Sequence, residues 1–331
     1  MDILRAPALP SLCPHDRVSR PLTIALYQMR WYPDPEAHKR RIEEGVAAAA
    51  MAGAQIVFLP ELTLSRYPAD TLPEGRADTT AEPLADGPTF LFAAELAKRY
   101  DLHVHASLFQ LSGADDGRGL NTAIVVSPNG ELIAHTHKLH IPVTTGYYED
   151  HYFAPGPNEA PYPVHHMAFD SGDAALGLPT CWDEWFPEVA RNYALRGAEM
   201  LAYPTAIGSE PDFPDFDTEP LWRQTIVGHA IANGLFIAVP NRFGGEGTVE
   251  FYGSSFIVDP FGRLLAQAPR DKEVTLVADI DLGWREDWLT LFPFLATRRP
   301  DTYAALCDDV ANPRTQGGHG AAGGIAGIKP Q

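Results

Sequence analysis

Short apolar runs alternate with segments of helical periodicity along most of the chain. LTIALYQ at Leu22–Gln28 is a β-rich run, and a helical pattern follows through Arg40–Met51. Gly53 ends that helix, and the near-continuous apolar run GAQIVFLPE then predicts a strand covered on both faces, with Glu61 at its C-terminal end. The same alternation predicts later helices at Thr89–Tyr100, Phe186–Arg196 and Glu219–Asn233, and strands at Leu102–Phe109, Asn121–Val126, Glu131–His135, Ala174–Thr180, Glu199–Pro204, Leu235–Val239, Gly253–Val258 and Val274–Asp279. This order predicts helices packed outside β-sheets, an α/β fold.

Three segments fall outside the alternation. Ile141–Pro163 is rich in Pro, Gly and Tyr and has no clean period, so we expect an ordered loop beside a site. Residues 1–20 are interpreted as a leader, which could be mobile, and residues 307–331 as a Gly-rich C-terminal tail with few anchors. Residues 21–306 then form one large domain, a size that layered α/β enzymes often reach.

Composition and charge narrow the classes of partner. Of the 331 residues, 45% are hydrophobic and 21% charged, which is ordinary for a globular protein. The formal net charge of -18 repels phosphate backbones and anionic membrane surfaces, so neither nucleic acid nor membrane is an expected partner. The most apolar run, Gly45–Leu59, is Ala-rich and contains two glycines, which indicates a helix turning into a strand. The N-terminal stretch lacks the features of a signal peptide, and we expect a cytoplasmic protein.

The spacing of the three cysteines, Cys13, Cys181 and Cys307, fits neither a disulfide framework nor a Cys-x-x-Cys metal site. Cys181 stands where an apolar strand ends and a helix begins a few residues later, a corner that exposes a thiol near backbone N–H groups. A nucleophilic cysteine needs a nearby base or cation, because an unperturbed thiol is mostly protonated at neutral pH. The alternative for a lone cysteine is a small buried core residue.

Three segments together favour the catalytic interpretation. FLPELTLSRYP, HKLHIPVTTGYYEDHYFAPG and TCWDEWFPEVARNYALRGAEMLAYPTAIGSEP resemble, in this order, the glutamate, lysine and cysteine segments of the nitrilase superfamily of carbon–nitrogen hydrolases. The resemblance extends from about Leu22 to about Leu306. It implies a four-layer αββα sandwich with the site at the C-terminal ends of strands, and no metal or organic cofactor. It also implies homodimers, and often larger assemblies, in which the region after Asp281 crosses to a neighbour.

The resemblance makes Glu61 the general base, Lys138 the oxyanion stabiliser, Cys181 the nucleophile and Glu149 a second glutamate that holds Lys138 in place. The chemistry agrees, since a carboxylate with a tuned pKa can take the thiol proton and return it to the leaving amine. A fixed lysine charge suits the position where the tetrahedral oxyanion develops, and the backbone N–H of Trp182 is the natural second donor. Candidates for contact with the substrate are Trp182, Tyr67, Tyr148 and Glu210, the last of these for a distal ammonium group.

Within the superfamily, YPTAIGSEP, LWRQTIVGHAIAN, FYGSSFIVDP and RRPDTY resemble N-carbamoylputrescine amidases most. The implied reaction is attack of the Cys181 thiolate on the carbonyl of a small N-carbamoyl amine or amide, through a thioester that water then hydrolyses. An N-carbamoyl-β-amino acid amidohydrolase, an aliphatic or ω-amidase and a nitrilase are the alternatives, because LTLSRYP after Glu61, and Thr180, depart from the amidase pattern. A carboxylate-bearing substrate would require an arginine in the pocket, for which three are available, Arg66, Arg223 and Arg242.

Two other signals point to different chemistry. His135, His137 and His140 form an H-x-H-x-x-H string, and the first two would share one face of a strand, as in some zinc sites. Because the string runs through the lysine segment, we expect no metal. Cysteine followed by tryptophan is also found in papain-like proteases, but Pro179 and Thr180 stand where a glycine and a cysteine are expected.

A non-catalytic binding or scaffold module with the same fold is a further class of function. The intact set of Glu61, Lys138 and Cys181 argues against it. Rapid alkylation of Cys181 in preference to Cys13 and Cys307 would support an enzyme, whereas equally slow reaction of all three thiols would favour the scaffold.

Overall fold

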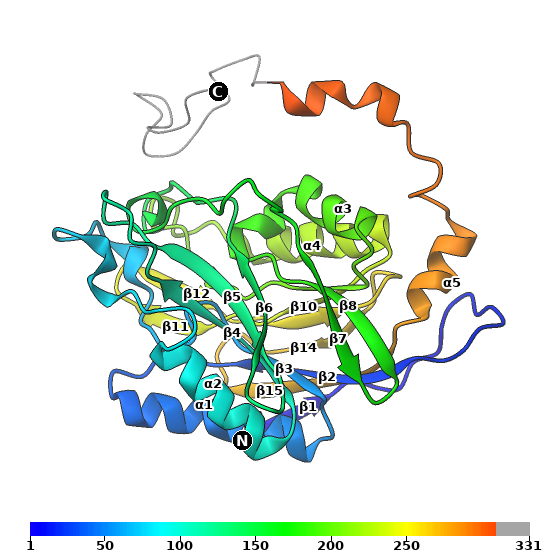
Figure 1. Ribbon diagram of the computed structural model, residues 1–331, viewed down its shortest axis with the longest axis horizontal. Helices are drawn as coiled ribbons and strands as arrows, with labels where there is room; N and C mark the ends of the chain where they lie inside the picture. The colour runs from blue at the N-terminus through cyan, green and yellow to red at the C-terminus, as the bar shows by residue number, and fades with distance from the viewer. Residues whose placement is uncertain (309–331) are drawn as a thin grey trace.

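The computed structural model describes residues 1–308, in which two β-sheets pack face to face between two outer layers of helices (Figure 1). The first sheet has the strand order β1 (Asp2–Arg5), β15 (Val274–Asp281), β2 (Pro21–Gln28), β3 (Ile56–Phe58), β4 (His103–Gln110), β5 (Leu120–Val126) and β6 (Leu132–His137). The second has the order β14 (Leu264–Gln267), β13 (Phe256–Val258), β10 (Phe236–Val239), β9 (Met200–Ala202), β8 (Gly172–Gly177) and β7 (Val164–Phe169). A separate hairpin joins β11 (Phe243–Glu246) to β12 (Val249–Tyr252).

The helices cover the outer faces of the two sheets. In the apolar core between the first sheet and its helix layer lie side chains of α1 (Pro35–Met51) and α2 (Pro88–Tyr100). A second core joins α3 (Pro187–Leu195) and α4 (Glu219–Asn233) to the second sheet, and a third fills the space between the sheets. Each sheet is therefore buried on both faces, which explains why strands such as QIVFL read as continuous apolar runs. The predicted four-layer αββα sandwich is confirmed.

Local sequence signals mark the ends of several elements. Proline occupies the first turn of each of the four helices α1 to α4, where its missing N–H costs nothing. Gly130 lies at φ +78° in the turn between β5 and β6, a conformation that favours glycine. The strand predicted at Ala174–Thr180 ends earlier, since β8 stops at Gly177 and an extended segment leads to Cys181. Elements absent from the prediction are β1, β7, β11, β12, β14 and α5 (Trp284–Leu291).

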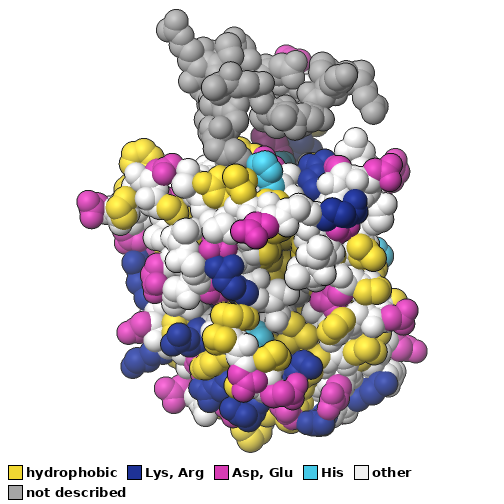
Figure 2. Space-filling view, turned by 90° about the vertical axis from the view of Figure 1, so that its left-hand side faces the viewer, with side chains coloured by type: hydrophobic (Ala, Val, Ile, Leu, Met, Phe, Trp, Pro, Cys, Tyr) yellow, Lys and Arg dark blue, Asp and Glu magenta, His cyan; other side chains and the backbone are white. Residues whose placement is uncertain are grey.

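The predicted leader contributes a strand to the first sheet. Asp2–Arg5 of the predicted leader form β1, which pairs in parallel with β15 at the edge of the first sheet. The predicted tail lies outside the described residues from position 309 onward, while Ala304–Cys307 forms a short 3₁₀ helix. Among residues 1–308, no helix is both long and apolar enough to cross a bilayer. Figure 2 shows acidic and basic side chains interspersed over one face, not gathered by sign.

The topology brings the three chemical segments to one end of the sandwich. β3 and β4 are parallel, β5 runs antiparallel to β4, and β6 antiparallel to β5, so β3 and β6 point the same way. Glu61 follows β3 and Lys138 follows β6 directly, while Cys181 follows β8 of the second sheet. The site is thus assembled from loops of both sheets.

Candidate active site

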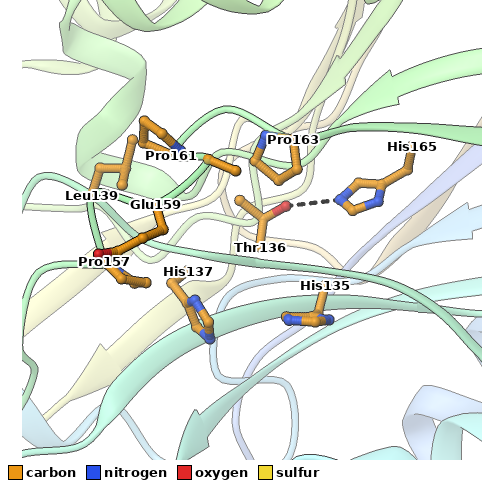
Figure 3. Close-up of a pocket in the computed structure, with 10 residues that line it drawn as sticks. His135, Thr136, His137, Leu139, Pro157, Glu159, Pro161, Pro163 and His165 are labelled. Atoms are coloured by element: carbon orange, nitrogen blue, oxygen red, sulfur yellow. Dashed lines mark hydrogen bonds between the residues drawn. The ribbon is translucent and has the colours of Figure 1, made fainter.

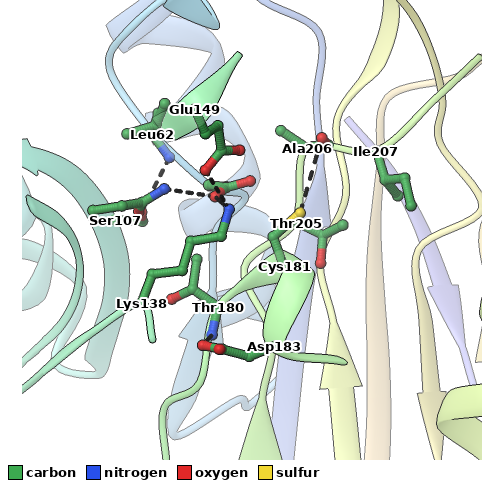
Figure 4. Close-up of polar contacts among 12 residues, drawn as sticks. Leu62, Ser107, Lys138, Glu149, Thr180, Cys181, Asp183, Thr205, Ala206 and Ile207 are labelled. Carbon is green, nitrogen blue, oxygen red and sulfur yellow. Dashed lines mark hydrogen bonds and ion pairs between the residues drawn. The ribbon is translucent and has the colours of Figure 1, made fainter. Parts of the chain in front are cut away.

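A buried lysine between two buried carboxylates forms the centre of the site. Lys138 Nζ donates to Glu61 Oε1 at 2.9 Å and to Glu149 Oε2 at 2.6 Å, and all three side chains are closed off from solvent (Figure 4). Burial alone would lower the pKa of Lys138, but Glu149 and Glu61 together raise this pKa well above its ordinary value. Lys138 is therefore a fixed positive charge. Two of its three N–H donors are used by the carboxylates, which leaves one for another acceptor.

Neighbouring side chains hold the two carboxylates in place. Asn121 Nδ2 donates to Glu61 Oε1 at 2.7 Å, and the Tyr67 hydroxyl donates to Glu149 Oε1 at 2.9 Å. Burial raises the pKa of Glu149 to about 7, against the opposing charge of Lys138. Glu61 Oε2 has no hydrogen-bond partner among the described residues although it is buried. A carboxylate oxygen in this state can accept a proton, which is what a general base requires.

Cys181 faces this cluster from the other sheet. It begins a short 3₁₀ helix, η4 (Cys181–Trp185), with φ at +42°, a conformation that non-glycine residues rarely adopt. Its N–H donates to the Pro204 carbonyl at 3.0 Å, and Sγ lies 4.0 Å from the Ala206 carbonyl oxygen. Burial and the charge of Glu61 raise the pKa of the thiol well above its usual value, whereas Lys138 lowers it. These influences together favour the thiol over the thiolate, so a nucleophilic Cys181 needs a nearby base.

The carboxyl group of Asp183 joins the cysteine turn to the lysine loop. Asp183 accepts from the Thr180 N–H at 3.0 Å, and also from the N–H of His140 at 2.9 Å and its Nδ1 at 2.7 Å. The His140 ring also stacks on Phe186, with 3.8 Å between ring centroids. Asp183 thus joins the segment of Cys181 to the segment of Lys138, yet it was not among the predicted site residues. Its position two residues after the cysteine was the available signal.

Arg242 supports the loop that carries Glu61. Its guanidinium donates to the backbone carbonyls of Glu61 at 2.9 Å and Leu62 at 3.1 Å, and pairs with Glu246 at 2.7 Å. Glu246 in turn accepts from the Tyr67 N–H at 2.8 Å. Arg242 is almost completely buried and both of its terminal nitrogens have protein partners, so the sequence-based suggestion that it binds a substrate carboxylate has no support in its contacts.

The predicted substrate-binding residues differ in their exposure to solvent and in the groups that they contact. Trp182 is partly exposed and packs edge-to-face on Phe186, while Tyr67 is completely buried behind Glu149 and is bonded to it. Tyr148 is half-buried, and its N–H donates to the Ala69 carbonyl at 2.8 Å. The position of Tyr67 suits a residue that orients Glu149 better than one that touches a substrate.

Tyr147, which was not predicted, connects the site to the loop of Glu210. Its hydroxyl donates to the Ser209 carbonyl at 3.1 Å and accepts from the Gly208 N–H at 3.0 Å. Burial raises the pKa of Tyr147 well above its usual value, and the charges of Glu210, Cys181 and Glu149 act on it as well. The Tyr147 hydroxyl is therefore bonded to the two residues that directly precede the half-buried Glu210.

The histidine string lies apart from this cluster. His135 and His137 project from β6 into a cavity of about 330 Å³, with His165 opposite, and His165 Nε2 is 3.1 Å from the Thr136 hydroxyl (Figure 3). His140 is bonded to Asp183 instead. Within residues 1–308, no three His, Cys, Asp or Glu side chains are placed to hold a metal ion together. His135 and His137 therefore line the cavity, whereas His140 belongs to the link between the cysteine turn and the lysine loop.

Comparison with known proteins agrees with the fold. Residues 23–288 match the family model described as carbon-nitrogen hydrolase. A citrullinase of Francisella tularensis is 34% identical over 85% of this chain and 96% of its own length. An N-carbamoylputrescine amidase of Solanum lycopersicum is also 34% identical, over 89% of this chain and 98% of its own.

A solved structure extends the agreement to the backbone. The carbon–nitrogen hydrolase of Helicobacter pylori G27 superimposes with a TM-score of 0.77 at 31% identity, over 87% of this chain and 99% of that one. The family match covers both sheets except β1 and the first two residues of β2, and its range includes Glu61, Lys138, Glu149 and Cys181. The chain belongs to the carbon–nitrogen hydrolase family of the nitrilase superfamily and is an enzyme that acts on non-peptide C–N bonds.

Proposed function

We propose that this enzyme hydrolyses a small N-carbamoyl amine that carries a positive charge, with Cys181 as nucleophile and a thioester-type S-carbamoyl intermediate. One observation carries the proposal. A thiol, a buried ammonium and a carboxylate with an unpartnered oxygen meet at one end of the sandwich, at Cys181, Lys138 and Glu61.

In the first half-reaction, Glu61 Oε2 takes the proton of Cys181 Sγ as the sulfur attacks the ureido carbonyl carbon. The developing oxyanion accepts from the remaining N–H of Lys138 Nζ and from the backbone N–H of Trp182. Trp182 is the second residue of η4, a position whose N–H has no acceptor within the helix. Collapse of the tetrahedral species breaks the C–N bond, and Glu61 passes its proton to the leaving amine.

In the second half-reaction, water attacks the carbonyl carbon of the S-carbamoyl group. Glu61 accepts a proton from this water, and the C–S bond breaks with return of a proton to Cys181. The product is carbamic acid, which decomposes to carbon dioxide and ammonia. Glu149, itself held by Tyr67, would keep Lys138 oriented throughout.

Charges near the site favour a cationic substrate over an anionic one. Arg66 pairs with Asp70 at 2.7 Å, and Arg223 with Glu219 at 3.0 Å, so these arginines have carboxylate partners already, as Arg242 does. Burial raises the pKa of Glu210, a carboxylate that an ammonium partner would stabilise in its charged form. N-carbamoylputrescine and citrulline, after which the two relatives are named, share a ureido group and an amine joined by an aliphatic chain, and citrulline carries a carboxylate as well.

Ammonia release over a panel of compounds tests the proposal. N-carbamoylputrescine should be hydrolysed faster than citrulline, whose carboxylate has no free arginine to receive it, and faster than N-carbamoyl-β-alanine, simple aliphatic amides and nitriles. Cys181→Ala should abolish release, and mass spectrometry of the wild type should trap a carbamoyl adduct on Cys181. A preference for nitriles or anionic ureido acids, or activity that survives in Cys181→Ala, would refute it.

Glu210 is the residue that we expect to distinguish charged from neutral substrates. Glu210→Gln should raise KM about tenfold or more for the amine-bearing ureido compound, because one charged hydrogen bond is lost. The KM for a neutral N-alkylurea of the same length should not change. Glu250→Gln, an exposed carboxylate on β12, serves as the matched control. Equal effects of Glu210→Gln on both substrates would exclude this role.

A further inference from the structure

Glu184 is a fully buried carboxyl group that the proposed chemistry does not use. It lies three residues after Cys181 in η4, with its side chain directed away from solvent toward α4 and the end of β9. Trp222 Nε1 donates to Glu184 Oε1 at 2.5 Å, and Thr205 Oγ1 lies 3.2 Å from Oε2. His229 Nε2 is 3.0 Å from the Glu184 carbonyl oxygen.

The hydroxyl proton of Thr205 has two possible acceptors. Thr205 Oγ1 lies 2.8 Å from the Tyr203 carbonyl oxygen and 3.2 Å from Glu184 Oε2, and its single proton can serve only one of them at a time. The carbonyl oxygen is the nearer of the two and can only accept. A hydroxyl that donates to Tyr203 presents an acceptor to Glu184, and a protonated Oε2 would complete that contact as a hydrogen bond.

No cation is free to balance an ionised Glu184 in the described part of the site. Glu184 interacts with several titratable groups, through their charges or, for His229, through a hydrogen bond to its backbone carbonyl. These groups are Glu61, Lys138, Cys181, His229, Tyr203 and Tyr252. Lys138 is the cation among them, and it already pairs with Glu61 and Glu149. Burial raises the pKa of Glu184 well above its usual value, in agreement with a protonated Oε2.

We propose that Glu184 is a neutral carboxylic acid in the working enzyme and a positioning residue for Cys181. It accepts from Trp222 and donates to Thr205, and so fastens η4 to α4 and to the segment whose Ala206 carbonyl faces Sγ. It does this without placing a third negative charge beside the thiolate. The positioning role rests on the proposed function of Cys181, whereas the protonation state does not.

Glu184→Gln tests the protonation state. A glutamine has the shape of the neutral acid and can accept from Trp222 and donate to Thr205 in the same way. The rate of Cys181 alkylation by iodoacetamide, followed by mass spectrometry against pH, should keep its midpoint in this variant. An ionised Glu184 would raise the thiol pKa in the wild type, so a midpoint about one unit lower in Glu184→Gln would overturn the proposal.

Infrared spectroscopy gives a second readout that needs no turnover. The wild-type minus Glu184→Gln difference spectrum at neutral pH should contain the C=O stretching band of a protonated carboxylic acid. The carboxylate bands in its place would overturn the proposal. Both measurements can be interpreted even if the enzyme hydrolyses none of the ureido compounds, so a failure of the proposed function is distinguishable.

A comparison of two neutral variants tests the positioning role. Glu184→Gln should keep kcat within about threefold of the wild type, whereas Glu184→Leu, similar in size but without hydrogen bonds, should lower kcat about tenfold or more at unchanged KM. Equal and undiminished kcat in both variants would exclude the role. If Glu184→Leu does not fold, Glu184→Met replaces it, and a wild-type-like kcat there counts equally against the role.

Discussion

At the scale of single residues, the charge on Lys138 determines the electrostatics of the site. A lysine without solvent would normally lose its proton, but two carboxylates within 3 Å keep it charged. The same cation makes it possible to bury Glu61 and Glu149. The three groups therefore depend on one another for stability as well as for the proposed chemistry.

Lys138→Met should lower the free energy of unfolding by about 3–5 kcal/mol, because two carboxylates would be left buried without their cation. Adding Glu149→Gln should restore part of this loss by removing one of the charges. Urea denaturation at pH 8 measures both effects. Lys98→Met, at an exposed position in α2, is the control and should stay within about 0.5 kcal/mol of the wild type. A loss in Lys138→Met no larger than in the control would contradict the mutual dependence.

At the scale of elements, the short helix η4 and its connections decide how Cys181 meets the other groups. Asp183 ties η4 to the loop after β6, and Glu184 ties it to α4 and to the segment after β9.

The alternation of strands and helices was predictable because buried strands and amphipathic helices leave strong periodic signals. β1 was not predicted because all four of its residues are exposed, and β11 because its FGGE sequence has low strand propensity.

α5, which the sequence pattern did not predict, holds the leader against the domain. Arg17 donates to both carboxylate oxygens of Asp287, at 3.0 and 2.9 Å, and also pairs with Asp281 at 3.0 Å. The His15 N–H adds a bond to Asp287 at 3.0 Å. Although burial would raise it, these partners lower the pKa of Asp287 to about 2.

This shift predicts a pH-dependent contribution of Asp287 to stability. A carboxyl group whose pKa is lower in the folded state stabilises the fold above its unfolded pKa, near 4, and loses this contribution as pH falls toward 2. The expected size is about 2 kcal/mol. The difference in unfolding free energy between wild type and Asp287→Asn should therefore shrink between pH 5 and pH 2. Asp301→Asn, at an exposed position, is the control, and a pH-independent difference for Asp287→Asn would contradict the assignment.

At the scale of the whole molecule, two sheets contribute separate halves of one site. Glu61 and Lys138 follow strands of the first sheet, Cys181 follows a strand of the second, and Glu149 lies in the connection between the two sheets. Any change in how the sheets pack would separate the nucleophile from its base. The large apolar core between the sheets resists such a change, and so supports the site as well as the fold.

We also expect an assembly of at least two chains, because apolar side chains after Asp281 are open to solvent. Leu291, Phe292 and Leu306 are 54%, 45% and 65% exposed. Sedimentation velocity should give at least twice the chain mass of 36.2 kDa. Leu291→Asp with Phe292→Asp should shift the mass downward, whereas Met51→Asp, exposed at the end of α1, should not. A wild-type species of single-chain mass would contradict the expectation.

The sequence by itself determined the fold class, the family and the candidate residues Glu61, Lys138, Glu149 and Cys181, because periodicity and short motifs are local properties of the chain. Only the tertiary structure revealed that Arg242 is committed to backbone carbonyls, that Tyr67 lies behind Glu149, and that Asp183 and Glu184 anchor the cysteine turn. These contacts join loops of two sheets that meet only when their apolar faces pack. A side chain's partners, and with them its charge state, are set by that packing.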